Sequence, residues 1–474
     1  MRIKNLLLLF FLLLSYSFSY AGDGYRIQLH LKNTQDSIVY LVHYYGKPLP
    51  TIYISDSAKI DKKGNALFHK KDSVLGGIYM ILFSDRQTHF EFLLNNGDNM
   101  TIEADVKSLP ESIKFKNSPE NDHFLAYMNF LTDFSKRQKT LQEELSKAQT
   151  AEDTNAIRQK GAKLGKELTQ YRRDYAQKHP QALLSQIFNA METPEVPEGK
   201  HYFPDGTEDT MFAYTYYKAH YWDKFNFKDD RLIHTPIYEN KLDEYINKLT
   251  FPHEDSVIKE ADMLLTKTKG QIDLFKYTLY WLTRNAETSK VMGMDKVFVY
   301  LVENYYMRGA AFWLDNDALQ KYYEAAAKKS NNLIGKVAPE IVMQDINGKV
   351  HRLSEFKAKY TLLVFWDPTC GHCTKEVPRI DSVYRAVLKD KGVRVMAIRT
   401  ESPVEKWTDF IEKNNLHDWL HLYDPEHKSD YRFKYDVFST PVIYLLDEKK
   451  IIRGKRLDHS NIMQVIELTE KNLK

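Results

Sequence analysis

The sequence predicts a multidomain protein with three folded parts: a small antiparallel β domain, a mostly α-helical middle domain and a C-terminal α/β domain. Residues 24–108 contain short runs in which apolar and polar residues alternate, a pattern typical of strands. Residues 118–330 contain long stretches that are poor in glycine and proline, and residues 333–474 alternate between strand-like and helix-like runs. A chain of 474 residues, 43% of them apolar, can build several such domains with proper cores.

The first residues resemble a secretory signal peptide. Arg2 and Lys4 give a basic start, an apolar run over 6–14 follows, and small residues stand at the first and last positions of 19–21. The run is short for a membrane span, although an uncleaved N-terminal anchor is the alternative. No cysteine lies near the cleavage site, which argues against a lipoprotein. We expect residues 1–21 to be removed and the mature protein to act in the periplasm or cell envelope.

The charge balance argues against a nucleic-acid partner. The formal net charge is +3, and removal of Arg2 and Lys4 with the signal peptide leaves +1. A nearly neutral chain lacks the strong positive field that attracts nucleic acids or acidic membranes.

The β domain is expected over residues 24–108. We predict strands at 25–31, 39–42, 66–68, 77–83, 89–94 and 100–104. Short strands at this spacing, separated by turn residues, predict a small antiparallel sandwich or barrel.

The middle domain, residues 118–330, is expected to be helical. Two long helices fill 124–175 with a break near 151–153. We predict shorter helices at 209–225, 236–250, 255–267, 270–286, 295–306 and 316–328.

The C-terminal domain, residues 333–474, opens with a hairpin signal at Asn347-Gly348. We then predict strands at 361–366, 393–399, 441–446 and 451–453, and helices at 371–389, 404–414 and 460–471. This alternation predicts a mixed sheet covered on both faces.

The chain has only two cysteines, Cys370 and Cys373, and they lie where a buried strand meets a helix. Cys-x-x-Cys in that position predicts the thiol–disulfide exchange site of a thioredoxin fold. The free N–H groups and dipole at a helix N-terminus favour a thiolate, which is the reactive species. We expect Cys370 to attack and Cys373 to resolve the mixed disulfide.

Three other uses of this cysteine pair fit the sequence poorly. A structural bridge across two residues closes almost no loop, zinc requires more ligands, and haem attachment requires histidine where Thr374 stands. We therefore expect no metal and no cofactor. His372, if protonated, would stabilise the Cys370 thiolate and favour an oxidant or isomerase, whereas an exposed spacer would have little effect; both remain open.

Residues 333–474, about 30% of the chain, resemble the thioredoxin-like domain of TlpA/ResA-like thiol–disulfide oxidoreductases, which are related to the AhpC/TSA group. The matching motifs are Gly335-Lys336-Val337-Ala338-Pro339, Leu353-Ser354-Glu355-Phe356, Val364-Phe365-Trp366, the Cys-Gly-His-Cys box, Glu376, Pro378 and Ser439-Thr440-Pro441. The preceding regions resemble the accessory domains of Bacteroidota-type relatives.

The resemblance implies roles for residues around the cysteines. A cis Thr440–Pro441 bond, with an ordinary trans proline as the alternative, would turn backbone polar groups toward the sulfurs. We place Pro441 in the catalytic site and expect Thr440 and Trp366 to bind substrate. Glu376 would act as general base for Cys373; the alternative is a carboxylate that is simply favoured near a helix N-terminus.

Three departures from related families affect the expected chemistry. Thioredoxins carry a buried aspartate six residues before the first cysteine, where this chain has Val364. ResA-like reductants often carry Glu-Pro between the cysteines, whereas Gly-His is the pair of protein disulfide isomerases, so the direction of electron flow stays open. Peroxiredoxins need a threonine three residues before the attacking cysteine, and Asp367 holds that position before Cys370.

Two classes of function follow from the sequence. The first is an exported enzyme that exchanges disulfides with protein thiols and is recycled by another redox protein. The second is a partner-binding or assembly protein whose redox site is regulatory or vestigial. The intact cysteine pair, with Trp366, Pro378 and Pro441, favours the first, and no oligomeric state is specified.

Overall fold

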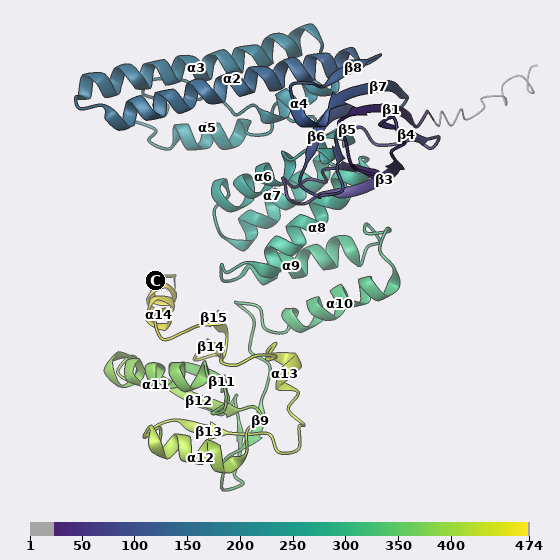
Figure 1. The fold of residues 1–474 in the computed structure, drawn as a ribbon. Helices are drawn as coiled ribbons and strands as arrows, with labels where there is room; N and C mark the ends of the chain where they lie inside the picture. The colour runs from purple at the N-terminus through teal and green to yellow at the C-terminus, as the bar shows by residue number, and fades with distance from the viewer. Residues whose placement is uncertain (1–22, 473–474) are drawn as a thin grey trace, which may run out of the picture. The chain divides into compact units, whose positions relative to one another are not determined.

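The computed structural model describes residues 23–472, so the predicted signal peptide at 1–21 lies outside the described residues. The chain divides into two compact units: residues up to Leu249 with Leu265–Tyr277, and Thr250–Leu264 with the chain from Thr278 onward. Figure 1 follows the chain from a β domain through helices to an α/β domain, which confirms the predicted multidomain class. None of the described helices combines the length and apolar character of a membrane span.

The β domain consists of two four-stranded sheets, in the orders β4-β1-β7-β8 and β3-β2-β5-β6. The strands are β1 (Tyr25–Lys32), β2 (Ile38–His43), β3 (Tyr53–Lys59), β4 (Asn65–Lys70), β5 (Gly77–Leu82), β6 (His89–Leu94), β7 (Asp98–Asp105) and β8 (Lys114–Lys116). Alternate residues of both sheets, such as Ile27 and Phe92, are buried in one shared core.

One strand pair differs from the antiparallel expectation, because β1 pairs with β7 in parallel while the other pairs of the domain are antiparallel. Antiparallel neighbours can be joined by short turns, whereas β1 and β7 stand at opposite ends of the domain sequence and need no direct connection. Strands β3 and β8 were not predicted. Most of the β3 side chains are exposed, so this strand carries no apolar alternation.

The middle of the chain is helical. Its helices are α2 (Pro119–Lys147), α3 (Ala151–Lys178), α4 (Leu183–Met191), α5 (Phe212–His220), α6 (Tyr238–Asp243), α7 (Glu254–Lys267), α8 (Ile272–Thr288), α9 (Met294–Leu301) and α10 (Asn316–Ser330). Short 3-10 turns lie at Val106–Ser108 and Asp230–His234, and π turns at Glu244–Leu249 and Val302–Tyr306 extend α6 and α9. Helices α2 and α3 run side by side (Figure 1), and Thr150 caps α3 where the break between them was expected.

Two histidines pack tightly inside the first unit. The ring centroids of His43 in β2 and His234 lie 3.9 Å apart, and His234 is only 7% exposed. A Cβ atom added at Gly77 would lie 2.2 Å from the Cβ of His234, so β5 passes too close to His234 for any residue but glycine at this position. Burial, together with the neighbouring His43, lowers the pKa of His234 from 6.5 to about 3.

The C-terminal domain contains a five-stranded mixed sheet in the order β13-β12-β11-β14-β15. Its strands are β11 (Tyr360–Trp366), β12 (Val393–Arg399), β13 (Leu420–Leu422), β14 (Val442–Asp447) and β15 (Ile452–Lys455), and β9 (Val342–Gln344) pairs with β10 (Val350–Arg352) in a separate hairpin. The helices are α11 (Cys373–Val383), continued by a π turn at Tyr384–Leu388, α12 (Val404–Lys413), α13 (Tyr431–Lys434) and α14 (Ile462–Asn472).

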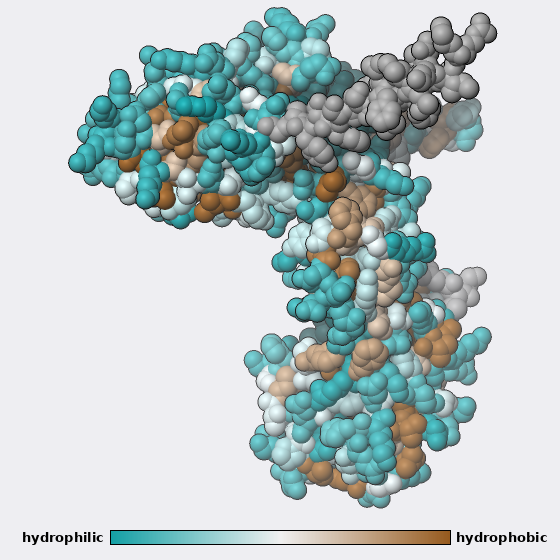
Figure 2. Space-filling view, turned by 90° about the vertical axis from the view of Figure 1, so that its right-hand side faces the viewer, coloured by the Kyte–Doolittle hydropathy of each residue, from teal (hydrophilic) through white to brown (hydrophobic). Residues whose placement is uncertain are grey.

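Both faces of this sheet are covered, as the sequence predicts. Residues of α11, α12 and α14 bury one face, and the β9–β10 segment and α13 bury the other. The central strand β11 is buried along its whole length. On the face of the molecule seen in Figure 2, the surface is mostly hydrophilic and apolar residues form separate patches.

A buried lysine ties β15 to the helical segment within the second unit. Lys455 Nζ lies 2.5 Å from Asp295 Oδ2 and 3.1 Å from the backbone oxygen of Asn332. Burial lowers the pKa of Lys455, although the carboxylate of Asp295 opposes this. The ammonium group is therefore compensated by charge and hydrogen bonds rather than by solvent.

Candidate redox site

The site begins where β11 leaves the sheet. Asp367 follows the last residue of the strand and is buried, and its carboxylate accepts hydrogen bonds from the backbone N–H groups of Thr369 at 2.8 Å and Ser402 at 2.7 Å. Burial raises the pKa of Asp367, but these hydrogen bonds and those from the Thr369 hydroxyl and Glu401 outweigh it and lower the pKa overall. The turn before Cys370 is thereby fixed to the loop that follows β12.

Cys370 lies three residues before α11, where its backbone carbonyl accepts a hydrogen bond from the Thr374 N–H at 3.0 Å, and it is partly exposed. Its Sγ atom is 3.3 Å from the backbone oxygen of Thr440. Partial burial acts to raise the pKa of Cys370, but interactions with Thr440, Cys373 and the backbone of His372 favour the thiolate and lower the pKa overall. A thiolate at this position is available to a disulfide in solution.

Cys373 is the first residue of α11 and is fully buried in the core beneath the helix. Burial raises the pKa of its thiol to about 12. Both cysteines are free in this structure. The two thiols thus differ in access and in acidity, although only two residues separate them.

The predicted cis bond between Thr440 and Pro441 is present. It precedes β14, which pairs with β11, and this pairing brings Thr440 beside Cys370. His372 is exposed at the N-cap of α11, and no side-chain hydrogen bond caps the helix there.

Glu376, the predicted general base, pairs with His459 in this structure. Its carboxylate accepts a hydrogen bond from the backbone N–H of His459 at 2.7 Å, and both of its oxygens lie within 3.0 Å of His459 Nδ1. The contacts of Glu376 among the described residues are thus with His459 and not with the sulfur of Cys373. His459 follows β15, so this ion pair joins α11 to the segment before α14.

The same place brings together three side chains of metal-ligand type. Ligand atoms of Glu376, Asp458 and His459 lie within 4.8 Å of one another. Glu376 and His459 already pair with each other, and Asp458 accepts hydrogen bonds from Ser460. The geometry therefore indicates an ion pair with its own hydrogen bonds, and we assign no metal to it.

Trp366 cannot contact a substrate, so its predicted binding role is wrong. Its side chain is 0% exposed and packs 5.1 Å from the ring of Phe410 in α12. It is the last residue of a strand that is buried on both faces, and its side chain points into the same core as Cys373. Trp366 therefore belongs to the core that packs under the turn with the two cysteines.

Three residues of the site were not predicted as functional. Asp367 anchors the turn before Cys370, and the signal for this was an Asp-Pro-Thr turn directly after a buried strand. His459 pairs with Glu376 across 83 positions of sequence, which no local pattern reveals. Phe438 is 62% exposed two residues before Thr440, and its local sequence gave no reason to expect an exposed phenylalanine there.

Three parts of the chain match known protein families. Residues 334–455 match the AhpC/TSA family, while residues 25–124 and 145–332 match two domains of unknown function, DUF4369 and DUF5106. The thiol-disulfide oxidoreductase ResA of Geobacillus kaustophilus is 28% identical over 137 residues, which are 28% of this chain and 76% of that protein. ResA of Bacillus subtilis is 29% identical over 133 residues, 28% of this chain and 72% of that protein.

Solved structures include similar domains. The crystal structure of a domain of a possible thiol-disulfide isomerase from Cytophaga hutchinsonii is 37% identical, and the match covers 30% of this chain and 95% of that one with a TM-score of 0.29. Residues 334–455 are therefore an AhpC/TSA family domain that has ResA thiol–disulfide oxidoreductases among its homologues, and it follows N-terminal domains of the DUF4369 and DUF5106 families.

Proposed function

We propose that the protein is a thiol–disulfide oxidoreductase that exchanges disulfides with other proteins through Cys370 and Cys373. The observation that carries the proposal is the difference between the two thiols. Cys370 is partly exposed with a lowered pKa beside Thr440, and Cys373 is buried with a pKa of about 12. An accessible thiolate next to a protected thiol is the arrangement needed for attack followed by resolution.

In the reductive direction, the Cys370 thiolate attacks one sulfur of a substrate disulfide. A Cys370–substrate disulfide forms, the substrate disulfide breaks, and the other substrate sulfur leaves as a thiolate. Cys373 then loses its proton and attacks Cys370 Sγ, which releases the second substrate sulfur and leaves a Cys370–Cys373 disulfide. The substrate gains two electrons from the cysteine pair, and a second redox protein must return them.

The reverse sequence oxidises a substrate dithiol with the same atoms. Gly371 and His372 separate the cysteines, and an exposed histidine beside a thiolate favours the reduced form of the pair when it is protonated. Stabilising the reduced form makes the disulfide a stronger oxidant. We therefore propose that the pair serves isomerisation or oxidation better than strong reduction, and a reduction potential above −220 mV would support this.

The backbone of Thr440 is proposed to bind the substrate next to the reactive sulfur. Its carbonyl oxygen already lies 3.3 Å from Cys370 Sγ, so an extended substrate segment held there would bring its own sulfur to the thiolate. Phe438, exposed two residues earlier, offers an apolar contact to the same segment.

We propose that the protein is exported and acts in the periplasm or cell envelope. The support is the basic start at Arg2 and Lys4, the apolar run after it, and a dithiol that can function in an oxidising compartment. N-terminal sequencing of the exported protein should begin after Ala21. A sequence that begins at Met1 would contradict the proposal.

The exchange reaction is tested by trapping. In a Cys373→Ser variant the mixed disulfide at Cys370 cannot be resolved, so substrate proteins should remain attached and should be released by dithiothreitol. The Cys370→Ser variant is the matched control and should trap nothing. Reduction of insulin by the wild-type chain, followed by turbidity, measures the complete cycle. Trapping by the Cys370→Ser variant alone would reverse the two roles, and no exchange by the wild-type chain would refute the function.

A further inference from the structure

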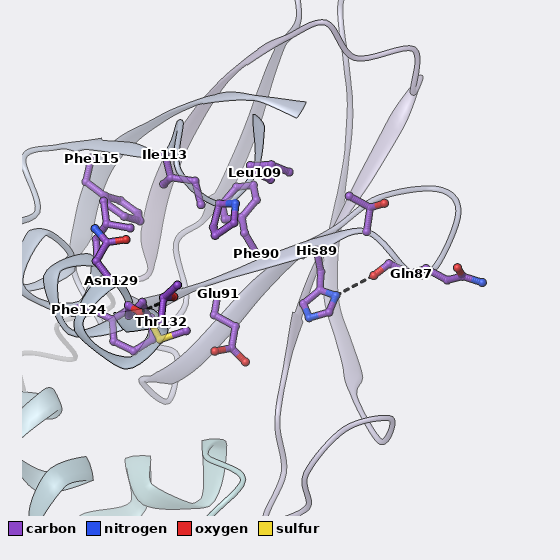
Figure 3. Close-up of a pocket in the computed structure, with 14 residues that line it drawn as sticks. Gln87, His89, Phe90, Glu91, Leu109, Ile113, Phe115, Phe124, Asn129 and Thr132 are labelled. Atoms are coloured by element: carbon purple, nitrogen blue, oxygen red, sulfur yellow. Dashed lines mark hydrogen bonds between the residues drawn. The ribbon is translucent and has the colours of Figure 1, made fainter. Parts of the chain in front are cut away.

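A cavity of about 530 Å³ opens at one edge of the β domain (Figure 3). It lies between the start of β6, the segment that leads into β8, and α2. Its apolar lining comes from Phe90, Leu109, Ile113, Phe115, Phe124 and Met128. Figure 3 shows Phe90, Leu109, Ile113 and Phe115 gathered around one space, with Glu91 and His89 directed away from it. The residues come from 87–132, so the cavity belongs entirely to the first unit.

The cavity lies beside an open strand edge. In the sheet β3-β2-β5-β6, β6 is an outer strand that pairs with β5 on one side only. At Leu93 the outer side is closed by a side chain of α2: Asn121 Oδ1 accepts the Leu93 N–H at 2.7 Å, and Asn121 Nδ2 donates to the Leu93 carbonyl at 2.8 Å. One carboxamide thus takes the place of a peptide group from a neighbouring strand.

The contact with Asn121 reveals which backbone groups of β6 point outward. Outward and inward groups alternate along an antiparallel strand, so if Leu93 points outward, Glu91 and His89 do so too. Thr88 fits this register, because its carbonyl accepts the Phe83 N–H on the β5 side. Within residues 23–472 no further strand pairs with β6 on the outer side. The edge is therefore open at the residues that line the cavity.

We propose that this edge and cavity bind an extended polypeptide segment as an added strand. The segment lies along the outer side of β6, next to the Asn121 carboxamide. It exchanges backbone hydrogen bonds with Glu91 and His89 and inserts an apolar side chain beside Phe90. Its next side chain falls on the opposite face, where the Glu91 carboxylate, which also accepts a hydrogen bond from the Tyr44 hydroxyl, favours lysine or arginine. The occupant is thus a peptide in which apolar residues alternate with polar or basic ones.

A peptide fits the site better than a lipid does. The cavity alone would accept any apolar group, but the outward N–H and C=O groups of β6 require a ligand that offers donors and acceptors at the spacing of a strand. An acyl chain would leave these backbone groups without partners. Binding at this edge does not depend on the redox activity proposed for the C-terminal domain.

The probe is a fluorescein-labelled nonapeptide that alternates valine or phenylalanine with threonine or lysine. It is titrated by fluorescence anisotropy into the chain from residue 22 onward, with both cysteines changed to serine so that no mixed disulfide contributes. We expect saturable binding. The same peptide with an N-methyl group on every residue, which cannot donate to a strand edge from either side, should bind at least tenfold more weakly.

Two variants locate the binding site on the protein. Met128 is 36% exposed in the cavity, so Met128→Asp should weaken binding at least tenfold without disturbing the core. His89→Pro removes an outward N–H at the first residue of β6 that no ladder bond uses and should have a similar effect. Met211→Asp changes an exposed methionine that does not line the cavity and should leave binding unchanged. Far-UV circular dichroism checks that each variant is folded.

Three outcomes would overturn the proposal. Equal binding of the N-methylated peptide would exclude backbone pairing, and equal binding by folded Met128→Asp would exclude the cavity. Saturable binding of oleate that Met128→Asp abolishes, with no binding of the peptide, would identify a lipid site. Because the cysteines are absent from this assay, none of these outcomes bears on disulfide exchange, and failed trapping at Cys370 would leave the peptide site untouched.

Discussion

Replacing His234 by glutamine should make the stability of the first unit less sensitive to acid. His234 is buried against His43, Tyr79 and Tyr45, and its pKa is about 3 in the folded chain against 6.5 for an ordinary histidine. Among residues 23–472, the carboxylate that acts on this histidine pair is that of Asp273, and it acts on His43. Between these two pKa values the unfolded chain binds one more proton at His234 than the folded chain, so stability falls as the pH decreases from 6.5 toward 3.

The size of the effect follows from the two pKa values. Between pH 7 and pH 5, a histidine with a pKa of about 3 when folded and 6.5 when unfolded lowers the free energy of unfolding by about 2 kcal/mol. The pKa of the partly buried His43 is also lowered, chiefly by burial, and adds to the loss in the same direction. Burial keeps solvent from screening the effect at His234.

The assay is urea unfolding at pH 7 and pH 5, followed by far-UV circular dichroism. From pH 7 to pH 5, the free energy of unfolding of the wild-type chain should fall by about 2 kcal/mol more than that of His234→Gln. This difference does not depend on how stable the variant is at pH 7. His69→Gln, which changes an exposed histidine of β4, is the matched control and should behave as wild type. Equal pH dependence in the wild type and His234→Gln would refute the reasoning.

Three further predictions concern the second unit. At pH 8, iodoacetamide should label Cys370 and spare Cys373 in the native chain, because the pKa of about 12 at Cys373 leaves roughly 1000-fold less thiolate than an ordinary value of 9.0. Mass spectrometry measures the labelling of each cysteine, and equal labelling would contradict the prediction. Asp367→Ala should cost about 2–3 kcal/mol in urea unfolding, because buried N–H groups lose their acceptor, and a loss below about 0.5 would contradict it. Asp295→Asn should cost roughly 3 kcal/mol by leaving Lys455 buried without its ion-pair partner, and an unchanged unfolding midpoint would exclude this.

The redox turn was predictable because its determinants are local. A fully buried apolar strand, a turn and a helix start are adjacent in the sequence, and Cys370 and Cys373 lie at their junction. The order of strands and helices in the C-terminal domain follows from the same local periodicities, and so does the multidomain class. Strands without such periodicity, β3, β8 and β13, were missed because they are short or largely exposed.

Pairing between distant residues could not be read from these patterns. The parallel contact of β1 with β7 joins the two ends of the β domain, and the Glu376–His459 pair spans 83 positions. Trp366 had the right residue type for a binding contact, but its burial depends on α12 packing over it. The open edge of β6 likewise depends on which strand lacks a second neighbour.

Local sequence therefore specified that the chain carries a reactive cysteine pair and that this pair lies between a buried strand and a helix. Periodicity, turns and the helix N-terminus act over a few residues, so they can be recognised without the fold. Folding in three dimensions specified that Trp366 is buried, where Glu376 finds its partner, and that Asn121 closes only part of a strand edge. The reason is physical: burial, charge compensation and backbone pairing depend on neighbours that chain folding brings together from distant positions.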